Sequence, residues 1–445
     1  MSEARDASVI EDNRRQVERL EKLGWYHSIE LPDGQVIEGH QSLEQQRHRL
    51  RQFPIPDDLT GKRVLDIGAW DGWFSFEMER RGAQVLALDM AKNTRLLEAR
   101  RLLGSKIEYR IGDICRLTWR DLGTFDIVLF FGVLYHLKHP LLALENVCGM
   151  TRGMACIESF VSDPDPTSIP VMEYYETGEL RGQLDNWVGP NASCLMAFTR
   201  TAGFARVKFE SALAERAHVT AWRQWPDEPN PAEAPSDAPE VLCVDNAATH
   251  DHRFSADADD YITFYFTSPL TDLDCDNVHP MIGPYGSRPI HVANTGGGWQ
   301  ATCKIPPGLA AGWYPAKLAV TGSAYCAPLQ IAVETPEPWA PASTGGLKVT
   351  RVTDGRSFED HRIVCGPDAC LSIWATGLPT DADAREIRVR LNGTDLPAIW
   401  LAPRNDGHPR QINALLPSGL EPGPASLSIL YRDLESPAAT AELVS

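Results

Sequence analysis

The spacing of hydrophobic residues changes along the chain, and this change divides it into an α/β part and a β-rich part. The run Val64–Ile67 is apolar apart from Asp66, as in a buried parallel strand. A turn containing Gly68 and Gly72 follows, and the apolar spacing then becomes helical over residues 73–81. A strand, a glycine turn and a helix form the first unit of a doubly wound sheet, which binds ligands beyond the carboxyl ends of its strands.

Further apolar runs of strand length extend the predicted sheet. They cover residues 84–88, 107–111, 125–131 and 153–159, with an antiparallel edge pair at residues 205–210 and 218–224. Helical spacing lies between several of them, at residues 92–103, 137–148 and 192–202. The sequence therefore predicts a Rossmann-like, seven-stranded α/β domain over residues 57–225. An N-terminal helical cap over residues 1–56, with helices at residues 11–23 and 40–53, would precede it.

Short alternating runs replace the helical spacing after residue 240. Residues 226–240 are rich in proline and acids and are expected to form a linker, and residues 336–346 are expected to form a second one. The turn Pro307-Gly308-Leu309 with Gly312 recurs as Ser418-Gly419-Leu420 with Gly423, each time before an alternating strand, which indicates a duplication. Two immunoglobulin-like β-sandwiches are therefore predicted, over residues 241–335 and 346–445.

Composition narrows the classes of function. No apolar run is long enough to span a membrane, and no secretory signal is visible at the N-terminus, so a cytoplasmic protein is expected. The 10 cysteines lack C-x-x-C spacing, and no metal site is expected. Cys365 and Cys370 are most simply free thiols, with a disulfide or a metal clip between them as the alternative. With 60 acids against 42 bases the net charge is −18, which disfavours a nucleic-acid partner.

Two motifs carry a family resemblance. The run D-I-G-A-W-D-G-W-F-S-F-E begins at Asp66, and F-D-I-V with G-V-L-Y-H spans Phe125 to His136. They resemble the class I S-adenosylmethionine (SAM) methyltransferases, in particular the subgroup similar to the tRNA wobble-uridine (oxyacetate- and methoxy-forming) enzymes. The first motif of class I enzymes has the pattern acid-x-G-x-G-x-G, and Trp70 replaces its middle glycine. The resemblance covers about residues 25–210 and implies SAM as the cofactor.

The resemblance also implies the cofactor contacts. The glycine turn would pass close to the amino-acid end of SAM, Asp113 would accept from the adenine amino group, and Ile114 would pack on the ring. Asp89 lies about 20 residues after the turn, where an acid is placed to hold ribose hydroxyls. Asp113 has the alternative of capping a helix. The expected cofactor-binding set is Asp66, Gly68, Ala69, Trp70, Asp71, Gly72, Asp89, Met90, Asp113, Ile114, Phe131 and Gly132.

The acceptor side is expected above the end of the strand over residues 125–131. Candidate catalytic bases are His136, His27 and Glu158. His136 has the alternative of bonding only to the backbone, and His27 that of a structural histidine. The expected substrate-binding residues are Tyr26, Tyr135, Tyr174, Trp187 and Asn191. Asn191 has the alternative of a helix N-cap, and the aromatic residues that of a packed cluster.

These expectations combine into a function. The chain is predicted to be a SAM-dependent methyltransferase that acts on a hydroxyl or amine of a small-molecule or glycan-type acceptor. The alternatives are a tRNA wobble-uridine methyltransferase and a SAM-fold scaffold without activity. Ordinary SAM is expected, since Leu137 stands where the resembling tRNA enzymes, which can use carboxylated SAM, carry arginine. Oligomerisation through the β domains is possible, and no membrane partner is expected.

Overall fold

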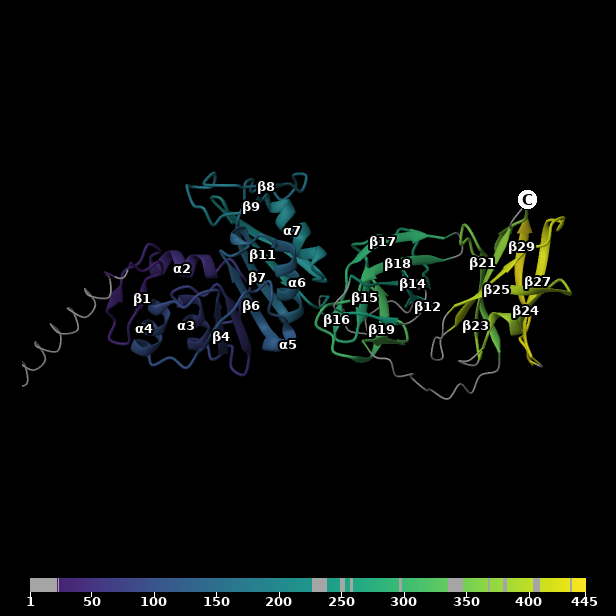
Figure 1. The fold of residues 1–445 in the computed structure, drawn as a ribbon, viewed down its shortest axis with the longest axis horizontal. Helices are drawn as coiled ribbons and strands as arrows, with labels where there is room; N and C mark the ends of the chain where they lie inside the picture. The colour runs from purple at the N-terminus through teal and green to yellow at the C-terminus, as the bar shows by residue number, and fades with distance from the viewer. Residues whose placement is uncertain are drawn as a thin grey trace, which may run out of the picture. The chain divides into compact units, whose positions relative to one another are not determined.

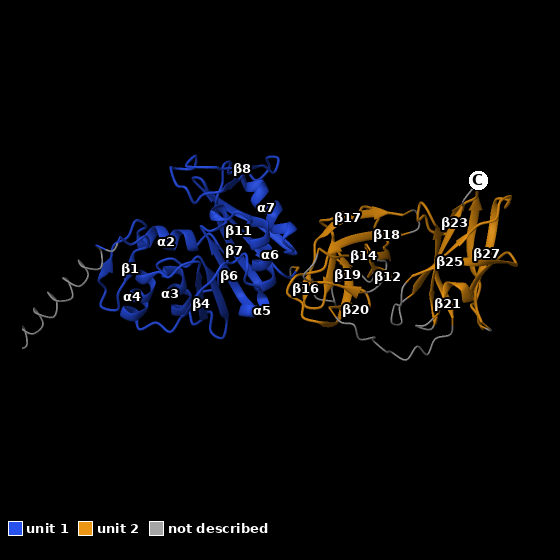
Figure 2. Cartoon of the chain, viewed as in Figure 1, with its two compact units in different colours: residues 1–224 blue, residues 225–445 orange. Residues whose placement is uncertain are grey.

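The computed structural model divides the chain into two compact units, residues 1–224 and residues 225–445 (Figure 2). It describes residues 22, 24–225, 238–248, 253–256, 259–295, 298–334, 347–366, 369–378, 382–402, 409–432 and 434–445. The helix predicted over residues 11–23, apart from Lys22, lies outside this described part. The same holds for most of the first predicted linker and all of the second.

A seven-stranded sheet organises the first unit and confirms the predicted Rossmann-like fold. Its strand β11 runs antiparallel to the other six, and Val64–Ile67 pairs with its neighbours on both sides. The order across the sheet is β10 (Arg206–Leu213), β11 (Arg216–Trp222), β7 (Thr151–Phe160), β6 (Phe125–Phe131), β3 (Arg63–Ile67), β4 (Gln84–Asp89) and β5 (Glu108–Ile111).

Helices cover both faces of this sheet, and a separate apolar core lies on each side (Figure 1). One core includes residues of α5 (Trp119–Leu122), α6 (Pro140–Met150) and α7 (Ala192–Thr201). The other includes residues of α2 (Leu43–Leu50), α3 (Trp73–Arg80) and α4 (Thr94–Leu103). A short 3-10 helix, η1 (Leu134–His136), follows β6.

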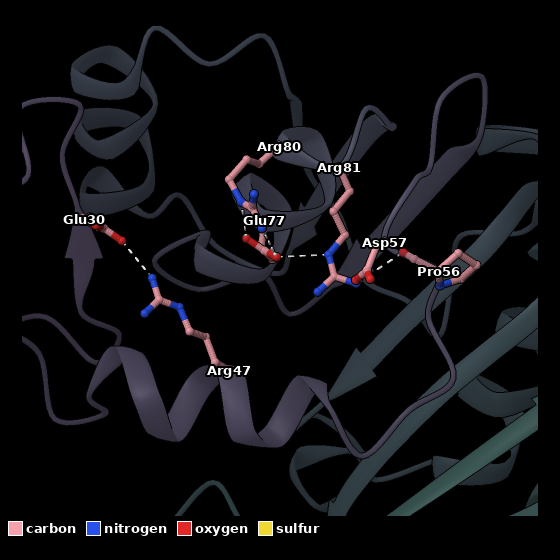
Figure 3. A network of polar contacts seen from close by, with 7 residues as sticks. All are labelled: Glu30, Arg47, Pro56, Asp57, Glu77, Arg80 and Arg81. Atoms are coloured by element: carbon pink, nitrogen blue, oxygen red, sulfur yellow. Dashed lines mark hydrogen bonds and ion pairs between the residues drawn. The ribbon is translucent and has the colours of Figure 1, made fainter.

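The N-terminal segment is only partly helical: α2 lies within the helix predicted over residues 40–53, but the described residues before it are not helical, which corrects the prediction of a helical cap. Between Trp25 and α2 it forms a two-stranded hairpin, β1 (Ile29–Glu30) and β2 (Val36–Ile37), because Pro32-Asp33-Gly34 makes a turn. One polar contact joins the hairpin to α2, and others join the end of the segment to α3 (Figure 3). Arg47 of α2 pairs with Glu30 at 2.8 Å, and Arg81 donates to the Pro56 carbonyl at 3.2 Å and to Glu77 of α3 at 3.0 Å.

A hairpin between β7 and α7 forms a flap on the same unit, with strands β8 (Met172–Tyr174) and β9 (Val188–Pro190) (Figure 1). The backbone N–H of Trp187 donates to the carbonyl of Tyr135 at 2.8 Å. This bond ties the base of the flap to η1, so the flap lies at the carboxyl end of β6.

The second unit is built from β-sheets. Two of them enclose a common apolar core. One contains β12 (Glu240–Asn246), β14 (Tyr261–Thr267), β18 (Trp299–Lys304) and β17 (Pro289–Asn294). The other contains β13 (Arg253–Phe254), β20 (Leu329–Val333), β19 (Gly312–Val320), β15 (Val278–Ile282) and β16 (Tyr285–Gly286).

The remaining strands surround a second core. They are β21 (Lys348–Asp354), β23 (Cys370–Thr376), β26 (Arg410–Leu415), β25 (Thr394–Leu401), β24 (Ile387–Leu391), β27 (Gly423–Tyr431), β29 (Ala439–Val444), β22 (Arg362–Val364) and β28 (Leu434–Glu435), with a 3-10 helix η2 (Ala384–Glu386). In both halves the repeated turn has its first glycine in the left-handed region, Gly308 at φ +88° and Gly419 at φ +84°, before β19 and β27.

Equivalent strands of the two halves carry the same irregularity. β12 has a bulge between Val241 and Cys243 that places Cys243 opposite Tyr265, and β21 has one between Val349 and Arg351 that places Arg351 opposite Trp374. Cys243, Tyr265 and Trp374 form one buried cluster. The two halves therefore contact each other and belong to one compact unit.

Candidate active site

The glycine turn connects β3 to α3 and is held against the end of β4. Gly68 has φ +75°, and a Cβ there would lie 2.3 Å from Val133 Cγ2, so a side chain is excluded. The N–H groups of Gly68 and Ala69 both approach the carbonyl of Leu88, at 2.8 and 3.3 Å. Trp70, at the glycine position of the family pattern, adopts φ +51° and leaves 47% of its surface exposed.

Asp89 ends β4 and faces this turn. Its two carboxylate oxygens accept from the N–H groups of Trp70 and Met90, each at 3.0 Å. Burial raises the pKa of Asp89, and these two bonds oppose that rise. The carboxylate is thus fixed beside the turn, next to the exposed side chain of Met90, which fits an acid that binds ribose hydroxyls.

The expected adenine contacts lie after β5. Asp113 is partly exposed, and its Oδ1 accepts from the N–H of Cys115 at 2.9 Å. This bond lies in a turn and no helix begins at Asp113, so the helix-capping alternative is not realised. Ile114 is 5% exposed and belongs to the core. The second carboxylate oxygen of Asp113 lies 3.5 Å from the Arg116 guanidinium.

Two acids of the expected cofactor set are turned into the protein. Asp66 is buried, accepts from the Ser75 hydroxyl at 2.6 Å, and has its pKa raised by burial to about 7. Asp71 has no exposed side-chain surface and contacts the N-terminal segment. Both differ from the expectation of cofactor contact, because their oxygens hold neighbouring protein groups.

A polar cluster joins the carboxyl ends of β6 and β7 to the start of β11. Arg216 binds both carboxylate oxygens of Glu158, with Nη2 to Oε2 at 2.7 Å, and its Nη1 donates to the Tyr135 hydroxyl at 3.0 Å. A Cβ on Gly132 would lie 3.1 Å from Arg216 Nη2, so the chain passes close to this cluster. Burial raises the pKa of Glu158, but the charge of Arg216 and the hydrogen bonds it donates outweigh burial and bring the pKa below its usual value.

His136 lies beside this cluster and keeps a third of its side chain exposed. Its Nδ1 is 3.0 Å from the backbone carbonyl of Asp185 and 3.6 Å from the Asp185 carboxylate. An Nδ1–H that donates to this carbonyl leaves the lone pair on Nε2 as an acceptor. Trp187 borders the same place, with Lys138 Nζ 4.0 Å above its ring.

His27 is buried within a row of aromatic rings. Its ring meets Phe74 at 5.4 Å, Phe74 meets Phe131 at 5.0 Å, and Phe131 stacks on Phe53 at 4.9 Å. Burial, and next the charge of Arg49, lower the pKa of His27 to about 3. The ring is therefore neutral at physiological pH and a weak base, which favours the structural alternative.

Three of the expected substrate residues lie apart from this cluster. Asn191 caps α7, accepting from the N–H of Cys194 at 2.8 Å, so the N-cap alternative is confirmed. Tyr174 is 67% exposed on β8, and Tyr26 is 38% exposed on the N-terminal segment. Within the described residues, no hydrogen bond or ring contact joins either tyrosine to Tyr135 or Arg216.

Sequence reasoning missed Arg216, Asp185 and Arg95, which have no motif around them. The described residues contain no group of three or more His, Cys, Asp or Glu side chains that could hold a metal ion. They also contain no helix that is long and apolar enough to cross a membrane.

Comparison with known proteins identifies the first unit's chemistry. Residues 65–153 match the family model described as "Methyltransferase domain". The chain carries a SAM-dependent methyltransferase domain. SAM is the cofactor of this domain, and the turn with Asp89 provides residues that fit it.

Several curated proteins are similar to part of the chain. The tRNA U34 carboxymethyltransferase of Idiomarina loihiensis is 29% identical over 172 residues, covering 35% of this chain and 49% of that protein. The Pseudomonas aeruginosa PAO1 protein of the same name is 32% identical over 155 residues, covering 33% and 46%. A ubiquinone biosynthesis O-methyltransferase of Xanthomonas oryzae pv. oryzae is 38% identical over 95 residues, covering 20% and 38%. The chain spans about half the length of the first two relatives.

Solved structures are similar to the first unit as well. The N-terminal domain of EvdMO1, crystallised with S-adenosylhomocysteine (SAH) and D-fucose, is 23% identical and covers 47% of this chain and 96% of its own, with a TM-score of 0.36.

Proposed function

We propose that the first unit transfers the methyl group of SAM to a hydroxyl or amine of a small-molecule or glycan-type acceptor. The observation that carries this proposal is the partly exposed His136, whose Nδ1 faces the Asp185 carbonyl beside the Tyr135–Arg216–Glu158 cluster. The turn at Gly68–Gly72, Asp89 and Asp113 would hold the cofactor. Bound SAM supplies an electrophilic methyl group on its sulfonium.

The protein then aligns the acceptor and removes its proton. Of the three candidate bases, Glu158 is bound by Arg216 with a lowered pKa, and the pKa of His27 is about 3. His136 is the best supported. As the acceptor oxygen bonds to the methyl carbon, its proton passes to Nε2 of His136, and SAH is left.

The acceptor class is supported by charge and by the aromatic residues. Tyr135 and Trp187 border the place above β6, and aromatic faces suit a planar or sugar-like molecule. The net charge of −18 weighs against RNA, whose binding depends on phosphate contacts. Methylation of a wobble uridine in tRNA and a SAM-binding scaffold without activity are the alternatives.

Calorimetric titration with SAM tests the cofactor site. Asp89→Ala should weaken binding by about 1.5–3 kcal/mol, because hydrogen bonds to a charged group are lost. Glu108→Ala, an exposed acid on β5, should bind like the wild type. Wild-type affinity in a folded Asp89→Ala variant would contradict the assignment.

Release of SAH with a panel of glycosides, phenols and tRNA transcripts tests the acceptor. Turnover with a hydroxylated small molecule supports the proposal, turnover on tRNA supports the first alternative, and SAM binding without turnover supports the second. His136→Gln should lower turnover by about 10²–10⁴-fold and remove the acidic limb of the pH–rate profile, with SAM affinity unchanged. An unchanged acidic limb would mean that a group other than His136 accepts the proton.

For the second unit we propose immunoglobulin-like sandwiches that offer a surface for oligomerisation, supported by the paired sheets around each core. A cytoplasmic location is supported by the 10 free cysteines, which suit a reducing compartment.

A further inference from the structure

Asp71 connects the glycine turn to the N-terminal segment. Its Oδ2 accepts from the backbone N–H groups of Tyr26 and His27, at 2.6 and 3.1 Å. Its Oδ1 lies 2.9 Å from Nε of Arg95, and the side chain is fully buried. Both oxygens of this carboxylate are therefore occupied by groups that lie far away in the sequence.

Arg95 completes the connection from the first turn of α4. Its Nη1 donates to the carbonyl of Gly24 at 2.8 Å, and its guanidinium lies 5.3 Å from the centre of the Trp70 ring. One arginine thus contacts the N-terminal segment through Gly24 and the glycine turn through Trp70 and Asp71. A planar guanidinium with several donors suits such a junction.

The same turn also fixes the acid expected to bind ribose. Trp70, the residue before Asp71, donates its N–H to Asp89, and it does so from a left-handed conformation that few bulky residues adopt. Any shift of Asp71 moves Trp70, and with it a hydrogen bond to Asp89. Two adjacent residues of one strained turn, Asp71 and Trp70, therefore connect the N-terminal segment to Asp89.

We infer that Asp71 and Arg95 are positioning residues that couple the order of residues 24–42 to SAM binding. This inference rests on the proposed function, since it assigns the turn and Asp89 to the cofactor. SAM bound at the turn would hold the segment in place, and the fastened segment would in turn favour SAM, because such coupling is reciprocal. Tyr26 and His27 are part of the fastened segment, so cofactor binding would also order these two residues.

Two measurements on the full chain test the coupling. One is hydrogen exchange of peptides within residues 24–42, with and without SAM, and the other is titration with SAM. In the wild type, SAM should slow exchange in this segment. Asp71→Ala should remove that protection and raise the SAM dissociation constant by about 5- to 150-fold, the usual range of coupling. Asp71→Asn keeps an oxygen for the two N–H groups but loses the charge that attracts Arg95. Its protection and its SAM dissociation constant should lie between those of the wild type and Asp71→Ala.

Glu30→Gln provides the matched control, because it breaks the exposed Glu30–Arg47 pair of the same segment (Figure 3) and should change neither readout. Wild-type affinity and protection in a folded Asp71→Ala or Asp71→Asn variant would overturn the coupling. Should Asp71→Ala fail to fold, Asp71→Asn and Arg95→Lys decide by the same two readouts. A wild type that does not bind SAM would instead overturn the proposed cofactor site.

Discussion

Each unit of the protein has an arginine that pairs with a buried carboxylate and lies beside aromatic rings, but the two surroundings differ. Arg216 binds Glu158 in the first unit, and Arg351 binds Asp360 in the second at 2.7 Å. The guanidinium of Arg351 lies 4.7 and 4.9 Å from the ring centres of Tyr265 and Trp374. Both side chains of the Arg351–Asp360 pair are almost fully buried, at 3% and 4% exposure.

The Arg216 cluster is open on one side. Arg216 retains 21% exposure and reaches the Tyr135 hydroxyl, and the partly exposed His136 lies next to it at the carboxyl edge of the sheet. A buried ion pair is therefore a poor marker of a site by itself. Its place at a strand end, next to groups that solvent or a ligand can reach, distinguishes Arg216 from Arg351.

The strongest test removes Arg216. Arg216→Met should destabilise the first unit by about 3–5 kcal/mol, because Glu158 is left buried and charged, and should abolish turnover. Hydrogen exchange resolved by unit, together with SAH release, measures both. Adding Glu158→Gln to Arg216→Met should restore much of the stability but no turnover. Recovery of turnover in the double variant would show that the pair is only structural.

The matching change in the second unit is Arg351→Met. It should destabilise that unit by about 3–5 kcal/mol, since Asp360 loses its partner. Turnover per folded molecule should stay at the wild-type level. A loss of turnover in the folded variant would show that the second unit contributes to catalysis, and would remove the contrast between the two arginines.

A smaller effect is expected from Asp66, whose folded pKa of about 7 lies above its ordinary value of 3.8. The folded state therefore holds a proton that the unfolded state releases, so this stabilisation is complete below pH 3.8 and is lost as the pH rises to about 7. The free energy of unfolding should change by at most about 1.4 kcal/mol per pH unit over this window. Asp66→Asn should flatten the stability of the first unit over this window, as measured by urea unfolding, whereas Glu108→Gln should not.

The smallest change is expected from truncation. A chain of residues 1–235 contains the whole first unit and should fold and bind SAM with unchanged affinity, because the division between units falls at residue 224. Circular dichroism and calorimetry check this. An insoluble fragment, or one that does not bind SAM, would show that the second unit completes the first.

The sequence predicted what local patterns determine. Alternation of strands and helices gave the sheet, and the distance from the glycine turn to Asp89 placed an acid beside it, as the structure has it. Contacts between distant residues were not accessible in this way. Asp71 meets Tyr26 across 45 positions, and Arg216 meets Glu158 across 58. Nothing near these residues in the chain indicates which partner their side chains reach.

The duplicated turns in the second unit lead to a consequence for its assembly. The strand positions of Tyr265 and Trp374 are equivalent, as are those of Cys243 and Arg351, so one face of a repeat meets the same face of its near copy. A contact between like faces is the kind that a self-complementary dimer uses, and here it lies within one chain. A fragment that ends at residue 334 would present half of such an interface to solvent. Dimers of that fragment in sedimentation measurements, absent in Tyr265→Ser, are the expected behaviour.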